Sequence, residues 1–593
     1  MQPRTVFRVV ALAAILTVLA GLLAAPSFAA PAAKGAAGRY LVLARSAADL
    51  GALRATAVAD GARVVGTIPQ LNAMVVRASA ATKGRLAADS RARGVASDRL
   101  SSPDMVDRAR PDLSAPGLRS AQRVPAAAAP AAAKAVGINP DPAWDYKGLL
   151  WDYRRMGLPQ GWRKTAGSPA VTVGVADTGL DFTHAELASK VTQVIDLTVL
   201  EGDEPICKTL FGQSDDDLAA QFGGPATTDW NGHGSWIGGN IAAALNGTGT
   251  NGIAPKVKLV ALKISQWCGF SSTAAELASF VTAADMGIDV VNISFGGYAD
   301  PADPETAAAF QAYADAIAYA RSKGTLIVGS AGNAHVRIGR NGRVTSHGQL
   351  TTPGTTAEDF VDLYGYYRVP TGPPGALVVS ATGNRVIATS ATCPPGTDDN
   401  ANATCKPASD PHQPFGVGKR DQLAYYSNYG ARVDIAAPGG ARKFNLGAYD
   451  RGGTPGFPVT SDDLTNAWQT FSTTSNWATE IPCYTFTKGS GFPQGQCYST
   501  IQGTSMAAPH ASAAVALIAS AHPSLRHRPG ALVARLRATA RSVSNSTPPL
   551  SATDTSPGDL TGLPCDTGFC HLGGPPISNR NAYGAGLAYV ANP

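Results

Sequence analysis

From about residue 142 onward, the chain alternates short, strongly apolar runs with longer stretches of helical composition. The runs are AVTVGVAD (170–177), VKLVALKIS (257–265), IDVVNISF (288–295), GTLIVGSAGN (324–333) and GALVVSATG (375–383). Runs this rich in Val and Ile are typical of parallel strands that are buried on both faces. Helical stretches such as TAAELASFVTAADMG would cover those faces. Residues 141–593 are therefore predicted to form an α/β domain with a doubly wound, mostly parallel sheet and helices on both faces.

The first 29 residues have the layout of a secretory signal peptide. Two arginines precede an apolar run over 9–25, and Ser27 and Ala29 fit the −3 and −1 positions of a cleavage site. The alternative is a retained membrane anchor, for which the run is short. No later segment is long and apolar enough to cross a membrane. We expect a secreted, extracellular protein with no membrane segment after cleavage.

Residues 39–100 are predicted to form a small β-α-β-β-α domain, followed by a Pro- and Ala-rich linker over 101–140. A signal peptide, a small domain and a flexible linker together are typical of a cleavable propeptide. An ordinary linker between two permanent domains is the alternative. Residues 1–140 hold 18 basic and 7 acidic side chains, whereas the rest of the chain holds 31 and 36. The excess of basic residues thus lies in the part predicted to be removed, and we expect no nucleic-acid partner.

The chain has eight cysteines, none of them before residue 200. An even number in a secreted chain indicates disulfides, although the sequence does not fix how they pair. Nearest-neighbour pairing is the simplest hypothesis: Cys207–Cys268, Cys393–Cys405, Cys483–Cys497 and Cys565–Cys570. A metal site built from Cys565, Cys570 and His571 is an alternative, but the spacing lacks the usual CxxC form.

Three polar residues stand where the predicted strands and helices end. Asp177 closes a strand, His233 lies in a glycine-flanked turn before a helix, and Ser505 stands where a loop meets a helix. A serine hydroxyl needs a base to become a nucleophile, and a histidine base needs a carboxylate to orient it. The backbone N–H of Ser505 and the side-chain amide of Asn333 could stabilise an oxyanion. Each residue alone could be a turn former, a loop residue or a helix cap; the joint pattern favours a catalytic triad.

Five segments together resemble the subtilisin-like serine peptidases: VADTGLDFTHAEL, NGHGSWIGG, NISFGG, SAGN and GTSMAAPHASAAVAL. The resemblance covers roughly residues 141–593. It implies an endopeptidase with Asp177, His233 and Ser505 as the triad and Asn333 as the oxyanion donor. It also implies that Ser294, Phe295, Gly296 and Gly297 form the edge that binds the substrate backbone and walls the S1 pocket, which holds the side chain before the scissile bond. The family usually has an aliphatic residue at the position of Phe295.

The resemblance further implies that residues 39–100 are an inhibitory, fold-assisting propeptide, so that the partners are peptide or protein substrates and the chain's own propeptide. We expect a monomer. The chemistry requires no cofactor. Family members often carry structural calcium, and the acidic run SDDDL (214–218) is a candidate for it, with a solvated loop as the alternative. No complete set of metal ligands can be assigned from the sequence.

Two other functions are weighed against the peptidase. An esterase or lipase of the α/β-hydrolase class would carry G-x-S-x-G and the order Ser, Asp, His, and this chain has neither. A non-catalytic binding protein on the same fold would typically lack a triad residue or Asn333. Residues 198–228, 334–370, 384–422 and 440–500 have the character of loop insertions, which we expect to restrict the substrate cleft.

Two residues near Ser505 in the sequence, His510 and Met506, lead to separate predictions. His510 is five positions further along the helix, so it does not share the helix face of Ser505, and we reject it as the base. Met506 adjoins the nucleophile. Its oxidation to the sulfoxide would place a larger polar group beside the oxyanion site.

Overall fold

The computed structural model describes residues 37–103, 149–346, 361–383, 426–440, 470–481, 491–543 and 577–593, with the short stretches 141, 349–350, 421–424, 483, 485–486 and 569–570. The predicted signal peptide and the linker after residue 103 lie outside the described residues, as do Cys393, Cys405 and Cys565 of the other two predicted cysteine pairs. Within the described residues, no helix combines the length and apolar character of a membrane span.

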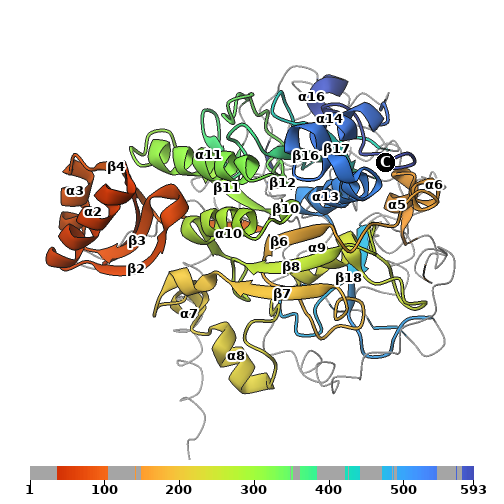
Figure 1. Cartoon of the computed structure of the whole chain (residues 1–593), viewed down its shortest axis with the longest axis horizontal. Helices are drawn as coiled ribbons and strands as arrows, with labels where there is room; N and C mark the ends of the chain where they lie inside the picture. Colours follow the sequence, from red (N-terminus) through yellow and green to blue (C-terminus); the bar gives the residue numbers. More distant parts are fainter. Residues whose placement is uncertain are drawn as a thin grey trace, which may run out of the picture.

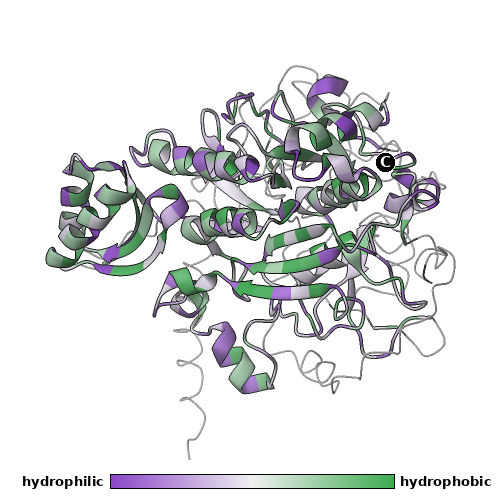
Figure 2. Ribbon diagram, viewed as in Figure 1, coloured by the Kyte–Doolittle hydropathy of each residue, from purple (hydrophilic) through white to green (hydrophobic). Residues whose placement is uncertain are grey.

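A seven-stranded sheet forms the centre of the larger domain, and its neighbouring strands are all parallel. In spatial order its strands are β17 (Ile435–Pro438), β16 (Leu377–Thr382), β12 (Leu326–Ser330), β10 (Val290–Ile293), β6 (Thr172–Asp177), β8 (Lys258–Lys263) and β7 (Val191–Asp196). Figure 2 shows these strands as largely hydrophobic. The order reverses direction at β6, as in a doubly wound fold, and the predicted α/β architecture is confirmed.

Helices cover both faces of this sheet (Figure 1). Helices α10 (Thr273–Asp285) and α11 (Thr306–Ser322) pack on one face, and α9 (His233–Ala242), α13 (Thr504–Ala521) and α14 (Pro529–Thr539) on the other. Successive side chains of one strand point to opposite faces, so Val290 joins the core beneath α13 and Val291 the core beneath α10. Smaller elements complete the domain: α5 (Trp151–Arg155), α6 (Leu158–Trp162), β13 (Gln349–Leu350), β14 (Val361–Asp362), β18 (Thr470–Thr473), β19 (Tyr498–Ile501), η6 (Pro523–Leu525), β20 (Phe569–Cys570) and α16 (Asn579–Tyr583).

The N-terminal domain is a four-stranded antiparallel sheet with two helices on one face. Its elements are β1 (Gly38–Ala44), α2 (Ala47–Ala59), β2 (Arg63–Ile68), η1 (Pro69–Leu71), β3 (Ala73–Ala78), α3 (Ala80–Ala88) and β4 (Ala92–Ser97). The second helix ends at Ala88, and β4 adds a fourth strand to the predicted β-α-β-β-α order. The segment ARGVAS holds a single large apolar residue, so its strand depends on pairing with β1 rather than on its own composition.

The other face of this small sheet packs on the larger domain. Leu41 and Ile68 share a buried cluster with Phe280 of α10 and Tyr313 of α11. The chain then leaves β4 and enters β5 (Leu100–Pro103), at the start of the predicted linker. Strand β5 lies between β11 (Phe295–Ala299) and β9 (Ser271–Ser272), antiparallel to both, and β15 (Tyr367–Val369) pairs with the other edge of β11.

The insertion over 198–228 contains η3 (Thr198–Glu201), α7 (Ile206–Phe211) and α8 (Asp215–Phe222). The predicted pairing of Cys207 with Cys268 is confirmed and ties α7 to the loop after β8. The predicted pairing of Cys483 with Cys497 is also confirmed. The first disulfide therefore fastens the insertion over 198–228 to the domain that carries the predicted triad, whereas the second closes a loop within the insertion over 440–500.

Candidate active site

The predicted triad and oxyanion residues all lie at the carboxyl ends of the parallel strands. Asp177 is the last residue of β6, and Asn333 follows β12 by three positions. His233 begins α9 and Ser505 is the second residue of α13. The side chains of Asp177, His233 and Ser505 are fully buried. Loops gather at this edge in open α/β sheets, which is why residues far apart in the sequence can share one site.

Asp177 and His233 form a buried pair with 2.8 Å between Oδ1 and Nδ1. The same carboxylate oxygen accepts the backbone N–H of Thr178 at 2.8 Å, which fixes the orientation of the carboxylate. A proton on Nδ1 of His233 then leaves Nε2 as the basic nitrogen. Among the described residues, nothing hydrogen-bonds to that Nε2. The imidazole is thus held in the tautomer that a general base requires.

Ser505 lies in the first turn of α13, where backbone N–H groups have no partner within the helix. Its Oγ–H donates to Sδ of Met506 at 3.2 Å. Its carbonyl accepts the hydroxyl of Ser294 at 2.8 Å, so the start of β11 is fastened to the turn that carries the nucleophile. Met506 is also completely buried, as expected for a side chain that adjoins the site.

The amide of Asn333 is oriented by Thr504. Its Oδ1 accepts the backbone N–H of Thr504 at 2.9 Å and the hydroxyl of the same residue at 2.8 Å. With Oδ1 occupied in this way, Nδ2 is directed away from Thr504. This Nδ2 is buried and has no acceptor among the described residues. A buried donor without a partner is costly, and the oxygen of a bound reaction intermediate would satisfy it.

His510 does not belong to the triad, in agreement with its rejection from the sequence. Its Nδ1 lies 2.7 Å from the carbonyl of Met506 and its Nε2 lies 2.9 Å from Oδ2 of Asp152. Both residues of this second pair are completely buried. The pair joins α5 to α13 and supports the helix that carries the nucleophile.

A buried charge network behind Asp177 was missed in the sequence. Lys263, the last residue of β8, donates from Nζ to the carbonyl of Thr178 at 2.6 Å and pairs with Asp215 at 2.8 Å. Asp229 accepts the Thr178 hydroxyl at 2.8 Å. Burial raises the pKa of Asp215 to about 6, although Lys263 opposes the shift. A lysine at the end of a buried apolar run was the available signal, because such a charge needs partners.

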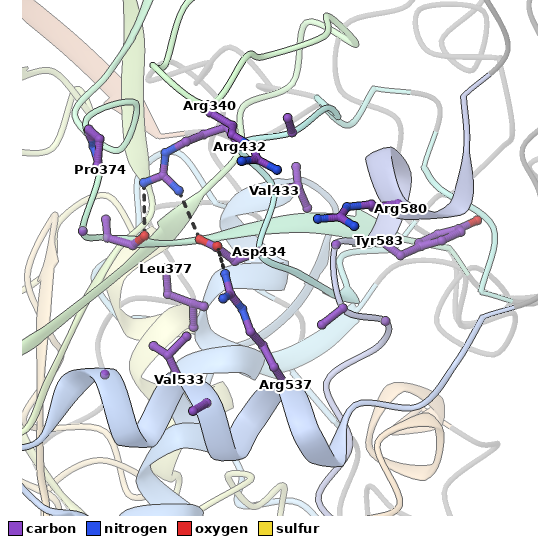
Figure 3. A pocket seen from close by; sticks show the side chains of 18 of the residues that line it. Arg340, Pro374, Leu377, Arg432, Val433, Asp434, Val533, Arg537, Arg580 and Tyr583 are labelled. Atoms are coloured by element: carbon purple, nitrogen blue, oxygen red, sulfur yellow. Dashed lines mark hydrogen bonds and ion pairs between the residues drawn. The ribbon is translucent and has the colours of Figure 1, made fainter.

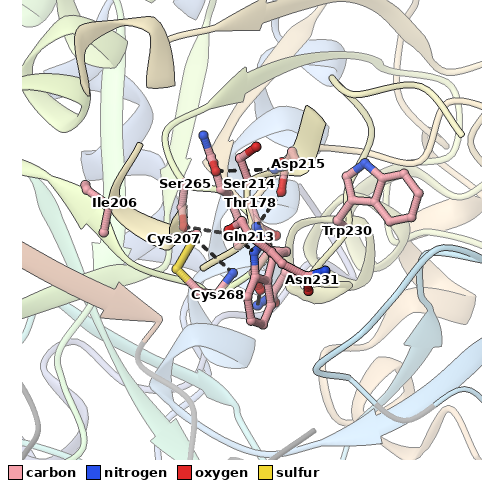
Figure 4. Close-up of a disulfide and its surroundings, with 12 residues drawn as sticks. Thr178, Ile206, Cys207, Gln213, Ser214, Asp215, Trp230, Asn231, Ser265 and Cys268 are labelled. Atoms are coloured by element: carbon pink, nitrogen blue, oxygen red, sulfur yellow. Dashed lines mark hydrogen bonds between the residues drawn. A yellow bond between two sulfur atoms is a disulfide. The ribbon is translucent and has the colours of Figure 1, made fainter. Parts of the chain in front are cut away.

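Residues of the acidic run over 214–218 make contacts within the protein, and Figure 4 labels two of them, Ser214 and Asp215. Ser214 and Asp217 form a reciprocal cap at the start of α8, and Asp215 faces Lys263. These carboxylates do not fit a calcium site. Within the part of the chain that the structure describes, no group of three or more His, Cys, Asp or Glu side chains is placed to hold a metal ion. A structural calcium ion stays a prediction without a location.

The predicted substrate edge is the edge on which β5 lies. Phe295 and Gly296 pair with β5, whereas Gly297 pairs with Val369 of β15. The ring of Phe295 meets the imidazole of His233 edge-on, with 6.1 Å between the ring centroids. Here an aromatic residue replaces the usual aliphatic one and packs against the base. Ser294 completes the predicted segment through its hydrogen bond to the carbonyl of Ser505.

A cavity of about 980 Å³ lies at the opposite ends of the strands, next to the amino ends of β16 and β17 (Figure 3). It is lined by Arg321, Arg340, Arg432, Arg537, Arg580 and Asp434, among others. Asp434 pairs with both Arg432 and Arg537. None of the predicted catalytic residues lines this cavity, so it is separate from the site built around Ser505.

The fold and the site define a doubly wound α/β protein with an Asp–His pair and a helix-borne serine at one sheet edge. The family model described as "Subtilase family" matches residues 168–559, and the chain belongs to this family. It is 29% identical over 251 residues to the "Thermophilic serine proteinase" of Bacillus sp. (strain AK1), covering 40% of this chain and 53% of the relative. It is 31% identical over 183 residues to "Thermitase" of Thermoactinomyces vulgaris, covering 30% and 53%. The chain thus spans about half the length of the curated relatives it matches.

Two solved structures share the fold over nearly the whole chain. The epidermin leader peptide processing serine protease from Staphylococcus aureus gives a TM-score of 0.55 at 18% identity, covering 94% of this chain and 97% of that one. Fervidolysin from Fervidobacterium pennivorans gives 0.51 at 19% identity, covering 95% and 61%. At this level of identity the likeness establishes the architecture alone.

Proposed function

We propose that this protein is a secreted serine endopeptidase that is made as a precursor with an inhibitory N-terminal domain. The observation that carries the proposal is that a histidine base and an asparagine amide donor both lie at the carboxyl ends of the parallel strands. Among the residues that the structure describes, His233 has a carboxylate on Nδ1 and a basic Nε2 without a hydrogen bond, and Asn333 has an oriented amide donor without an acceptor. Both features are costly in a folded protein and are explained by a reaction that uses them.

In the proposed reaction, Nε2 of His233 takes the proton of Ser505 while the serine oxygen attacks the carbonyl carbon of the scissile peptide bond. The resulting oxyanion accepts hydrogen bonds from Nδ2 of Asn333 and from the backbone N–H of Ser505. Collapse of the intermediate breaks the C–N bond, and His233 returns the proton to the leaving amine. Water then attacks the Ser505 ester by the same route and releases the acid. Asp177 stabilises the imidazolium in both steps, and no step uses a metal or cofactor.

The placement of the N-terminal domain supports its role as a propeptide. Strand β5 lies antiparallel between β9 and β11, so it takes the position of an extended peptide at the predicted substrate edge. The domain is attached by ion pairs of Lys83 with Glu305 and of Arg99 with Asp303, and by its apolar sheet face. A segment held in this way would exclude substrates until the linker is cut and the domain leaves. We propose that the mature enzyme acts as a monomer outside the cell.

The test is expression of the full precursor in a secretion host beside the Ser505→Ala variant. We expect the wild type to be cut between residues 100 and 141 and to digest casein, whereas the variant stays uncut and inactive. Thr539→Ala, far along the chain from the site, serves as a processed and active control. If the wild type and Ser505→Ala are cut alike and neither digests casein, the peptidase proposal is wrong.

A further inference from the structure

A buried arginine lies between the predicted wall of the S1 pocket on β11 and the loop that leads to Asn333. Arg368 is the central residue of β15 and is only 1% exposed. Its Nε donates to the carbonyl of Ala331 at 3.2 Å and its Nη1 donates to the carbonyl of Gly297 at 3.1 Å. The guanidinium therefore bridges the substrate edge on β11 and the loop that leads from β12 to Asn333.

Glycines on both segments make room for this guanidinium. A methyl group on Gly296 would overlap Cζ and both terminal nitrogens of Arg368, and one on Gly332 would lie 3.0 Å from its Nε. The ring of Tyr298 stacks over the same group, with 5.5 Å from Cζ to the ring centroid. The guanidinium is thus packed directly against Gly296 of the predicted substrate edge and against the ring of Tyr298.

The register of β5 on β11 relates this cation to a position in a bound peptide. Gly296 lies opposite Ser102 and Phe295 lies opposite Pro103. Because the two strands are antiparallel, one further step along the peptide brings the next residue opposite Ser294.

The residue opposite Ser294 would precede the scissile bond. The hydroxyl of Ser294 is bonded to the carbonyl of Ser505, so a chain that passes Ser294 has reached the nucleophile. In this protein's own sequence the residue that follows Pro103 is Asp104, and Met105 comes after it. Both lie just beyond the described strand. A peptide with this sequence that continued in the same register would therefore present an acidic residue at the position before the scissile bond.

We propose that Arg368 makes the S1 pocket selective for an acidic side chain, so that the enzyme cuts after Asp and first releases its own N-terminal domain between Asp104 and Met105. This inference rests on the proposed peptidase function and names its substrate class. A guanidinium is planar and always charged, and it recognises a carboxylate through two parallel hydrogen bonds. Each charge-assisted bond of this kind is worth more than a neutral one, so an uncharged side chain of equal size is disfavoured.

The first test measures kcat/KM on peptides that differ only in the residue before the scissile bond. We expect Asp to exceed the isosteric Asn by on the order of 10–100-fold, with Leu and Lys lower still. Arg368→Gln should bring the Asp-to-Asn ratio close to one. Arg343→Gln is the matched control, because Arg343 belongs to the same insertion, is itself exposed, and donates from Nε to the carbonyl of Gly365. That variant should keep the wild-type ratio.

A second test needs no change in the folded domain. In the precursor, Asp104→Asn should slow release of the N-terminal domain by a similar factor, whereas Asp107→Asn should not. The comparison of these two precursor variants therefore remains decisive if Arg368→Gln fails to fold. Casein digested by the wild type and mapped by mass spectrometry should show cuts mainly after Asp. Cuts mainly after neutral residues, or equal release of the Asp104→Asn and wild-type precursors, would overturn the inference and leave the peptidase proposal intact. No hydrolysis of casein or of any peptide would overturn both.

Discussion

Removal of the oriented amide of Asn333 gives the sharpest quantitative prediction. Its Oδ1 is held by two hydrogen bonds from Thr504, of 2.9 and 2.8 Å, so its Nδ2 is fixed before any substrate arrives. A donor that is oriented in advance stabilises the developing oxyanion without reorganisation. Asn333→Ala removes this donor and leaves the Asp177–His233 pair unchanged.

The loss of one oxyanion donor lowers kcat by about 10²–10³, which corresponds to ~2.7–4 kcal/mol of transition-state stabilisation. We expect a fall of this size in kcat for Asn333→Ala, with KM changed much less because the ground-state carbonyl makes a weaker hydrogen bond. Thr504→Val removes the hydroxyl that orients the amide but keeps the backbone donor. Its loss should therefore be smaller.

Peptide turnover by the mature proteins is the appropriate assay. Tagged wild-type enzyme can process each variant and then be removed, and Ser505→Ala treated in the same way sets the background. Thermal denaturation of each variant shows whether the fold is retained. If folded Asn333→Ala keeps more than about one tenth of the wild-type kcat, Asn333 is not an oxyanion donor and the assignment is wrong.

Three further predictions concern Met506, Glu201 and the disulfide between Cys207 and Cys268. Peroxide should lower kcat by oxidising Met506, whose Sδ lies 3.2 Å from Oγ of Ser505; Met506→Leu should resist it, and full activity after verified oxidation of Met506 would contradict this. Burial raises the pKa of Glu201 to about 8, from the 4.5 that is usual for a glutamate side chain. The folded protein therefore keeps a proton that the unfolded chain releases, and stability falls as pH rises between these values, by at most ~1.4 kcal/mol per unit. Glu201→Gln should flatten this slope when urea unfolding is measured at several pH values. An unchanged slope would show that Glu201 does not cause the pH dependence of stability. Replacing Cys207 and Cys268 by Ser opens a loop with a sequence separation of 61, which should cost about 2–4 kcal/mol by urea denaturation; an unchanged midpoint would count against it.

The architecture could be predicted because buried parallel strands leave a direct trace in the sequence. Each strand of the sheet centre is covered on both faces, so runs such as AVTVGVAD contain little but apolar residues. The same composition indicated two of the candidate site residues, since Asp177 and Asn333 each close one of these runs. Ser505 could be placed because small residues and a glycine turn mark the start of its helix.

Other features of the fold and of the site depend on contacts between distant segments, so the local sequence does not indicate them. Strand β4 forms because β1 offers it an edge, and β5 pairs with segments about 170 and 190 residues away. The pairing of Lys263 with Asp215, and the burial of Arg368 between β11 and the loop after β12, are likewise set by tertiary packing. The sequence places Arg368 only within an insertion of unknown shape. Its chemistry becomes apparent once β15 is paired with β11.

If Ser505 is a nucleophile activated by His233, a reagent that reacts covalently with activated serines will label it. A fluorophosphonate probe would be added to the mature protein and the adduct located by peptide mass spectrometry. We expect one adduct per chain, on Ser505, which is lost in His233→Ala and is strongly slowed in the intact precursor because β5 lies on the predicted substrate edge. A folded, mature protein that gains no adduct on Ser505, or labels equally well without His233, would contradict the account.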